Sequence, residues 1–201
     1  MKKIFYLVIP VFIVLLIWSI LGGNDGNNAY IQSIKTHRIE KDKFFKTSEA
    51  SPFVQKKTAY QPVSYYAPDP SYKVTAKLDR FTKRETVTIT NSDGSSIKYL
   101  KFGRLKFDLK GQENTILVLK QLGFLNQYLV AFADETSGVN TYGGGRYLDL
   151  IIGKSDRIEV DFNKAYNPYC AYFGDFLCPL PPRENILNIS IEAGEKDYES
   201  P

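Results

Sequence analysis

The chain of 201 residues has a single histidine, His37, and only two cysteines, Cys170 and Cys178. It also lacks the G-x-S-x-G and H-E-x-x-H patterns, which mark a nucleophilic serine and a zinc-binding histidine pair. These absences argue against histidine-assisted nucleophilic catalysis and a histidine-rich metal centre, and no cofactor is predicted. Whether the protein is an enzyme stays open, because a pair of carboxylates can hydrolyse glycosides without histidine.

The two cysteines are separated by seven residues, and zinc usually takes four ligands. A close pair in an exported domain is typical of a disulfide, so a Cys170–Cys178 bond is predicted, with a metal site as the competing interpretation. No set of metal ligands is assigned.

The one long apolar run, IFYLVIPVFIVLLIWSIL, lies at Ile4 to Leu21 and follows Lys2 and Lys3. As a helix it would span about 27 Å, close to the hydrocarbon core of a bilayer. Residues 1–23 are therefore predicted to be a signal anchor or transmembrane helix, and residues 24–29, which are rich in glycine and asparagine, a flexible linker. The alternative is a signal peptide that is cleaved to release a secreted domain.

Lys2 and Lys3 favour a cytoplasmic N-terminus, but Lys35, Arg38 and Lys41 lie close to the other end of the apolar run. The cysteine pair favours a domain outside the cytoplasm, so a single-pass membrane protein of the cell envelope is predicted.

The formal net charge is +4, and lysines such as Lys73, Lys77 and Lys98 alternate with apolar residues, as on a solvated sheet face. A nucleic-acid partner is not expected for such an exported domain.

Residues 30–201 are long enough for one domain with a substantial core. Tyr30 to Lys46 is predicted to be an amphipathic helix, and the rest reads as short alternating strands. Hairpins are predicted around Asn91 to Gly94, Gly111 to Asn114 and Gly153 to Asp156, and NILNISI is predicted to be a last strand. The predicted class is mainly β, a single antiparallel β-barrel or sandwich with an N-terminal helix.

Three stretches concentrate polar and aromatic residues: FADETSGVNTYGGGRYLDL, DFNKAYNPYCAYFGDFLCPLPPREN and IEAGEK. With these stretches, SPF at Ser51 to Phe53 and YAPDPSYKV at Tyr66 to Val74, the chain resembles the bacterial family of unknown function DUF1684 over about residues 35–196. DFNKAYNPYCAY and CPLPPREN are the most specific segments. The resemblance implies one recurrent domain and no particular activity.

GGGR, Gly143 to Arg146, is followed by a predicted strand rather than a helix, which argues against a phosphate-binding P-loop. The glycines can simply permit positive φ angles at a strand entry. Arg146 is predicted either to face an anion with its planar guanidinium, oriented by Asp161, or to be paired inside the protein with Asp161 or Asp134.

The loop Asp134 to Gly145 and the segment Asp161 to Tyr172 are expected to meet at one end of the β-structure, where function is often located. The Asp and Asn residues there are either turn formers or ligands of a hard cation or a polyhydroxylated molecule. The candidate ligand-binding residues are Asp134, Thr136, Thr141, Tyr142, Arg146, Asp161, Asn163, Tyr166, Asn167 and Tyr172.

Three functions follow from these candidates. The first is a binding module for a small or extended polar or anionic ligand. The second is a structural or assembly partner of another envelope protein. The third is an envelope hydrolase that uses two carboxylates among Asp134, Asp161 and Glu195 as acid and base.

Overall fold

The computed structural model describes residues 26–124 and 127–198 of the chain. The predicted membrane anchor, residues 1–23, lies outside these described residues, as do the first two residues of the predicted linker. Residues 26–29 of that linker are helical instead. In the described part of the chain, no helix combines the length and the apolar character needed to cross a membrane.

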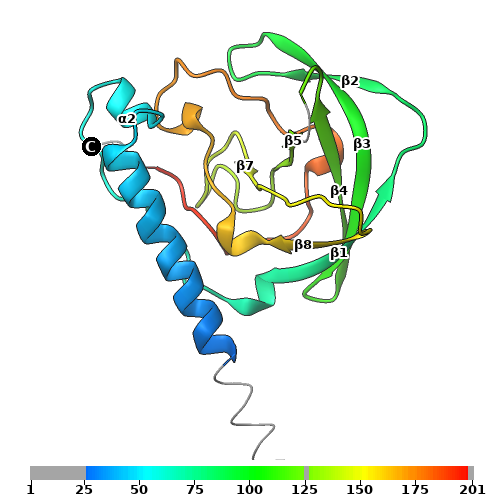
Figure 1. Ribbon diagram of the computed structural model, residues 1–201, viewed down its shortest axis with the longest axis horizontal. Helices are drawn as coiled ribbons and strands as arrows, with labels where there is room; N and C mark the ends of the chain where they lie inside the picture. Colours follow the sequence, from blue (N-terminus) through cyan, green and yellow to red (C-terminus); the bar gives the residue numbers. More distant parts are fainter. Residues whose placement is uncertain (1–25, 125–126, 199–201) are drawn as a thin grey trace, which may run out of the picture.

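A long helix and eight strands, joined by short helices, make up the described chain (Figure 1). The elements in chain order are the N-terminal helix 26–47, α2 Pro52–Gln55, η1 Pro70–Tyr72, β1 Lys73–Arg80, β2 Thr86–Thr90, β3 Ser96–Leu109, β4 Gln112–Gln121, β5 Tyr128–Leu129, β6 Ala131–Phe132, β7 Arg146–Tyr147, β8 Arg157–Asp161, η2 Phe162–Lys164, η3 Tyr169–Ala171 and η4 Arg183–Asn185, where η marks a 3₁₀-helix. A mainly β fold with an N-terminal helix is thereby confirmed.

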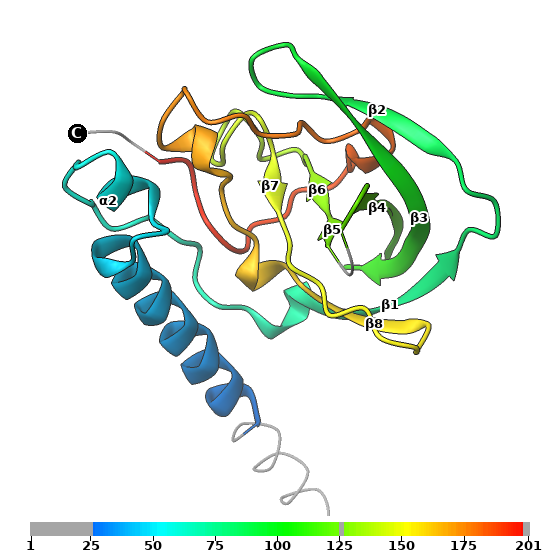
Figure 2. The same cartoon turned by 45° about the horizontal axis from the view of Figure 1, so that its top comes forward.

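The sheets are antiparallel, and within the described residues they do not form a closed barrel, which was one of the two predicted architectures. Six strands form one sheet in the order β5-β4-β3-β1-β8, with β2 also paired to β3, and β6 and β7 form a second, two-stranded sheet. The long strand β3 holds the larger sheet together, because its first half pairs with β2 and its second half with β1. Figure 2 shows how strongly these strands curve around the interior.

Local sequence explains the hairpins that were predicted correctly. β2 and β3 turn at Asn91 to Gly94, where Gly94 has a φ of +84°. β3 and β4 turn at Lys110 and Gly111, with φ angles of +53° and +79°, the two positive values of a type I′ turn. Since Leu109 already faces Gln112, this turn is tighter than the Gly111 to Asn114 turn that was predicted.

Two predictions in the C-terminal half are wrong. There is no hairpin at Gly153 to Asp156, because β7 pairs with β6 and β8 pairs with β1. NILNISI is not a strand either: this segment makes only a few backbone hydrogen bonds to residues 133–135. Leu187 and Ile191 are nevertheless buried, so the alternating pattern indicated the buried face without indicating strand pairing.

The core has a main part and two smaller parts. The main cluster lies inside the curved sheet and includes Leu105, Ile116, Val118 and Phe162. β4 is buried on both faces, since Leu117 belongs to a second cluster.

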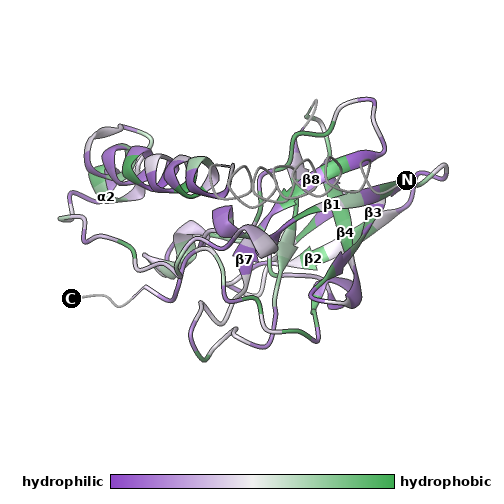
Figure 3. Ribbon diagram, turned by 90° about the horizontal axis from the view of Figure 1, so that it is seen from below, coloured by the Kyte–Doolittle hydropathy of each residue, from purple (hydrophilic) through white to green (hydrophobic). Residues whose placement is uncertain are grey.

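The third, largely aromatic cluster lies beside the N-terminal helix and contains Phe45, Phe53, Val63 and Tyr172. Ile34 and Phe45 are buried on one face of this helix, whereas Ile39 is 68% exposed. Figure 3 shows hydrophobic and hydrophilic residues alternating around the turns of the helix. The helix therefore docks through one apolar stripe onto the β-rich body.

Candidate functional site

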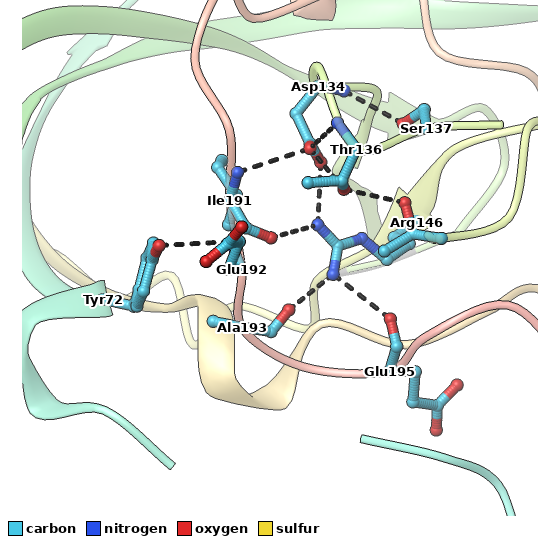
Figure 4. A network of polar contacts seen from close by, with 10 residues as sticks. Tyr72, Asp134, Thr136, Ser137, Arg146, Ile191, Glu192, Ala193 and Glu195 are labelled. Carbon is cyan, nitrogen blue, oxygen red and sulfur yellow. Dashed lines mark hydrogen bonds and ion pairs between the residues drawn. The ribbon is translucent and has the colours of Figure 1, made fainter. Parts of the chain in front are cut away.

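Arg146, at the start of β7, is buried completely and bound on several sides (Figure 4). Its guanidinium donates to Oδ2 of Asp134 at 2.7 Å and to the backbone carbonyl oxygens of Ile191, Ala193 and Glu195 at 3.0, 2.5 and 3.2 Å. Asp134 is also completely buried at its side chain. This arrangement fixes the C-terminal segment to the loop before β7 and leaves the guanidinium no route to a ligand.

The predicted role of Arg146 as an anion-facing donor oriented by Asp161 is therefore corrected. Of the two partners considered for an internal ion pair, Asp134 is the one found. The remaining oxygen of Asp134 accepts from the backbone and the hydroxyl of Thr136 at 2.8 and 2.6 Å, and Thr136 in turn lies 2.9 Å from the hydroxyl of Thr141. These three candidate residues close the loop on itself rather than facing outward.

The backbone conformation requires glycine at the last of the three consecutive glycines, Gly145. Gly145 has a φ of +83°, and a Cβ there would lie 2.5 Å from the side chain of Pro181 and 2.6 Å from the carbonyl oxygen of Phe132. The structural interpretation of the glycine run therefore holds at this position, next to the buried arginine.

Asp161 and Asn163 anchor the N-terminal helix. The hydroxyl of Tyr30 donates to Oδ1 of Asp161 at 2.8 Å, and the side-chain amide of Asn163 donates to the same hydroxyl at 2.8 Å. Asn163 also exchanges two hydrogen bonds with the backbone of Asp69. Burial, together with the adjacent Asp161 carboxylate, raises the pKa of Tyr30 well above its ordinary value. Both candidates thus join the helix to the body.

A second polar anchor surrounds Glu195, which is 1% exposed. Its carboxylate is 2.5 Å from Nζ of Lys41 on the helix and accepts from the hydroxyl of Tyr172 at 2.9 Å and the backbone of Asn167 at 2.7 Å. Burial and this carboxylate raise the pKa of Tyr172 far above its ordinary value. In Figures 1 and 2 the C-terminal segment that carries Glu195 runs between the helix and the β-rich body.

Cys170 and Cys178 are both free thiols in the structure, in contrast to the predicted disulfide. They are neighbours all the same, because the backbone N–H of Cys170 donates to Sγ of Cys178 at 3.1 Å. Tyr142, another candidate residue, donates its hydroxyl to Sγ of Cys170 at 3.7 Å. No group of three or more Asp, Glu, His or Cys lies together as metal ligands in the described part of the chain.

Three pockets that share wall residues lie elsewhere on the described surface, and we call them together the tyrosine groove. The helix pocket, about 420 Å³, is lined by His37, Glu40, Lys41, Phe44, Phe45, Asp149, Lys164, Tyr166 and Tyr169. The cysteine pocket, about 290 Å³, is lined by Tyr147, Tyr166, Pro168, Tyr169, Phe176, Leu177, Cys178 and Pro179. The sheet pocket, about 380 Å³, is lined by Tyr99, Gln121, Gln127, Tyr128, Leu129, Asp149, Leu150 and Pro179.

The three pockets share wall residues. Tyr166 and Tyr169 line the helix and cysteine pockets, Pro179 lines the cysteine and sheet pockets, and Asp149 lines the helix and sheet pockets. The hydroxyl of Tyr166 donates a hydrogen bond to Asp149 at 2.9 Å. Nζ of Lys41 lies over the ring of Tyr166, 4.6 Å from its centroid. Burial first, and then Asp149, raise the pKa of Tyr166, so its hydroxyl stays protonated and able to donate.

The helix pocket has a mixed electrostatic character. Lys41 and Lys164 bring positive charge, while Glu40 and Asp149 bring negative charge. Partial burial, followed by the nearby Lys164 and Lys41, lowers the pKa of His37 below its ordinary value of 6.5. The imidazole is therefore neutral at pH 7, and it offers both a hydrogen-bond donor and an acceptor.

Of the predicted ligand residues, Tyr166 lines the tyrosine groove, whereas the acid–base candidates Asp134, Asp161 and Glu195 do not. Sequence reasoning missed His37, Lys41, Asp149, Lys164 and Tyr169 as groove residues. Tyr169 stands within the polar, aromatic stretch already singled out. Asp149 and Lys164 also lie within the stretches singled out, although neither was chosen as a candidate. His37 and Lys41 had no signal of this kind, because the helix that supplies them reaches the groove only through its docking.

Together these features define a mainly β domain with a docked helix and an aromatic groove. The chain belongs to the DUF1684 family: residues 58–196 match its model, described as a protein of unknown function. It is also similar to the solution NMR structure of an uncharacterized protein of Haloarcula marismortui, with 34% identity and a TM-score of 0.63, over 86% of this chain and 97% of that chain. No curated protein matches the chain.

Proposed function

We propose that this protein is a binding module of the cell envelope whose tyrosine groove takes an extended, polyhydroxylated ligand such as a glycan strand. The N-terminal apolar segment would hold the domain at the outer face of the membrane, close to such polymers. Tethering of this kind raises the local concentration of a binder near its ligand.

The observation that carries this proposal is that three pockets share wall residues and that each has tyrosines among its walls. A tyrosine offers a flat apolar face and a polar tip, which suit the apolar ring faces and the hydroxyl edges of a sugar. Asp149, Gln121 and Gln127 add acceptors and donors for hydroxyl groups along the floor and rim. Three neighbouring pockets of about 290 to 420 Å³ suit a chain of several sugar rings better than a single small molecule.

A protein partner is the second candidate, because Leu177 at the edge of the cysteine pocket is 60% exposed. The tyrosine and phenylalanine walls beside it are of the residue types that are enriched at protein interfaces. The hydrolase has less support, since the three carboxylates considered for it are buried and engaged with Arg146, Tyr30 and Lys41.

Binding can be tested by co-sedimentation and calorimetry of the full-length protein with a panel of purified cell-wall and storage polysaccharides. We expect Tyr166→Ala and Tyr169→Ala to weaken binding by about 1–3 kcal/mol each, roughly 5- to 150-fold, because each removes a central wall. Phe81→Ala is the matched control, as Phe81 is an exposed aromatic outside the groove. Equal binding by all three variants, or no binding to any polysaccharide, would count against the proposal.

Location can be tested separately by adding protease to spheroplasts that express the protein. We expect the domain to be degraded while a cytoplasmic marker survives. A domain that stays intact while a periplasmic marker is cut would refute the proposed orientation. Release of a shortened soluble domain would instead support the cleaved signal peptide.

A further inference from the structure

The two thiols lie in a rigid setting. Cys170 sits in η3, and Cys178 follows the loop 171–177. Cys178 is bound to the turn between β2 and β3, since its backbone N–H donates to Oγ of Ser92 at 3.3 Å and its carbonyl accepts from the Ser92 N–H at 2.9 Å. The position of Sγ of Cys178, 3.1 Å from the backbone nitrogen of Cys170, is thus set by contacts on both sides.

The pair lies at the edge of the cysteine pocket, because Cys178 is one of its walls and Cys170 is in contact with Cys178. Cys178 and Cys170 are only 6% and 7% exposed, which protects them from large molecules. Cys178 is nevertheless a wall residue of the cysteine pocket, whose volume of about 290 Å³ opens between Tyr147, Tyr169 and Leu177. This volume is large enough for the reacting end of a low-molecular-weight disulfide.

The surroundings also favour a thiolate at Cys170. A hydrogen bond with Cys178 lowers the pKa of Cys170 to about 7, helped by Tyr142 and Ser92 and opposed by burial. The pKa of Cys178 is raised, because it is the thiol that holds the shared proton and it is also buried. A thiolate, not a thiol, attacks a disulfide, and a thiol with a pKa near ambient pH attacks fastest.

We propose that Cys170 and Cys178 are a redox-active dithiol that exchanges reversibly with low-molecular-weight disulfides entering through the tyrosine groove. The Cys170 thiolate attacks one sulfur of the small disulfide, forms a mixed disulfide and releases one small thiolate. Cys178 then loses its proton to that thiolate and attacks Sγ of Cys170, which expels the second thiolate; solvent protonates this leaving group with the proton lost earlier from Cys170. Two protein thiols become one disulfide, and one small disulfide becomes two thiols.

The exchange does not require a polysaccharide bound in the groove, so a negative result in the binding test would leave the exchange proposal unaffected. It predicts that the reduced form and the closed form, in which a bond ties η3 to the turn at Ser92, are both folded.

The test uses the full-length protein in detergent, reduced and then equilibrated at neutral pH with either reduced or oxidised glutathione. After acid quenching and denaturation, free thiols are alkylated with N-ethylmaleimide and intact mass is measured. We expect two adducts in reduced glutathione and none in oxidised glutathione, where the mass falls by two hydrogens. Returning the oxidised, folded protein to reduced glutathione at high excess should restore both adducts.

Variants identify the order of events. Cys178→Ser should accumulate one glutathione on Cys170, because no second thiol can expel it, whereas the wild type should retain none. Tyr142→Phe, which keeps both thiols, should slow the first step by removing a hydrogen-bond donor to Sγ of Cys170. If the serine variant does not fold, the count of alkylated thiols in the wild type still tests whether the pair exchanges with glutathione.

Three results would overturn the proposal. The first is that both thiols remain alkylatable after equilibration of the folded protein with oxidised glutathione. The second is that the disulfide appears only after the protein is denatured. The third is a disulfide present on isolation that glutathione cannot reduce without denaturant, since this is a permanent bond rather than an exchanging pair.

Discussion

Replacing Arg146 with methionine should destabilise the fold strongly. The change keeps much of the side-chain volume but leaves the Asp134 carboxylate buried without a cation, and removes the donor from three backbone carbonyls. Breaking a buried ion pair in this way costs about 3–5 kcal/mol, and the total stability of a domain is typically about 5–15 kcal/mol. For a domain of this size that loss corresponds to a fall in Tm of about 6–20 °C.

The assay is thermal and urea unfolding of Arg146→Met, Asp134→Asn and the double variant, followed by circular dichroism. The double variant should lose less unfolding free energy than the two single variants lose together, because removing both charges leaves neither one uncompensated. Lys73→Met is the control: Lys73 pairs with Glu159 at 2.9 Å, but these side chains are 37% and 59% exposed. This control should change stability by less than about 1 kcal/mol.

A Tm of Arg146→Met within about 2 °C of the wild type would refute the reasoning. It would mean that the buried guanidinium contributes little to the fold, and the ligand-facing role would have to be considered again. Strict additivity of the two single variants would also contradict a direct Asp134–Arg146 ion pair.

Gly145→Ala should lower stability by more than about 1 kcal/mol, because the position has a φ of +83° and a Cβ would lie 2.5 Å from a proline carbon. Gly153→Ala, with nothing within 4 Å of its Cβ, should be nearly neutral in the same melts; equal losses would contradict this account. Asn185→Ala should cost at least about 1–3 kcal/mol in urea unfolding, since it leaves buried backbone groups of β4 and β6 without partners. Tyr30→Phe should lower the free energy of unfolding by about 1 kcal/mol and speed amide hydrogen exchange in the helix 26–47. Unchanged exchange in that helix would exclude the proposed anchoring role.

The tyrosine groove depends on the helix as much as on the β-rich body. The family model matches residues 58–196, whereas His37, Glu40 and Lys41 belong to the helix before that range. Lys41 contributes twice, as the partner of the buried Glu195 and as a cation over the ring of Tyr166. A change in helix docking would therefore reshape one end of the groove while leaving the sheet pocket intact.

Local features of the sequence determined much of the fold. The hairpin between β2 and β3 and the alternation of β1 depend on neighbours within a few residues, so the sequence alone was enough to predict them. The helix was predicted for the same reason, since its apolar stripe repeats within the segment itself. The buried positions Leu187 and Ile191 were also recognisable, although their segment is not a strand.

Only the tertiary structure decided which polar groups meet. Asp134 and Asp161 were both available to Arg146 by residue type, but Asp161 is held by Tyr30 and Asn163, and Asp134 faces the guanidinium across β7. The groove was hidden for the same reason: its walls come from the helix, the stretch after β7 and the loop around η3. Core packing decides which surfaces face one another, and therefore which charged and aromatic side chains distant in the sequence come into contact. The spacing of residues along the sequence does not contain that information.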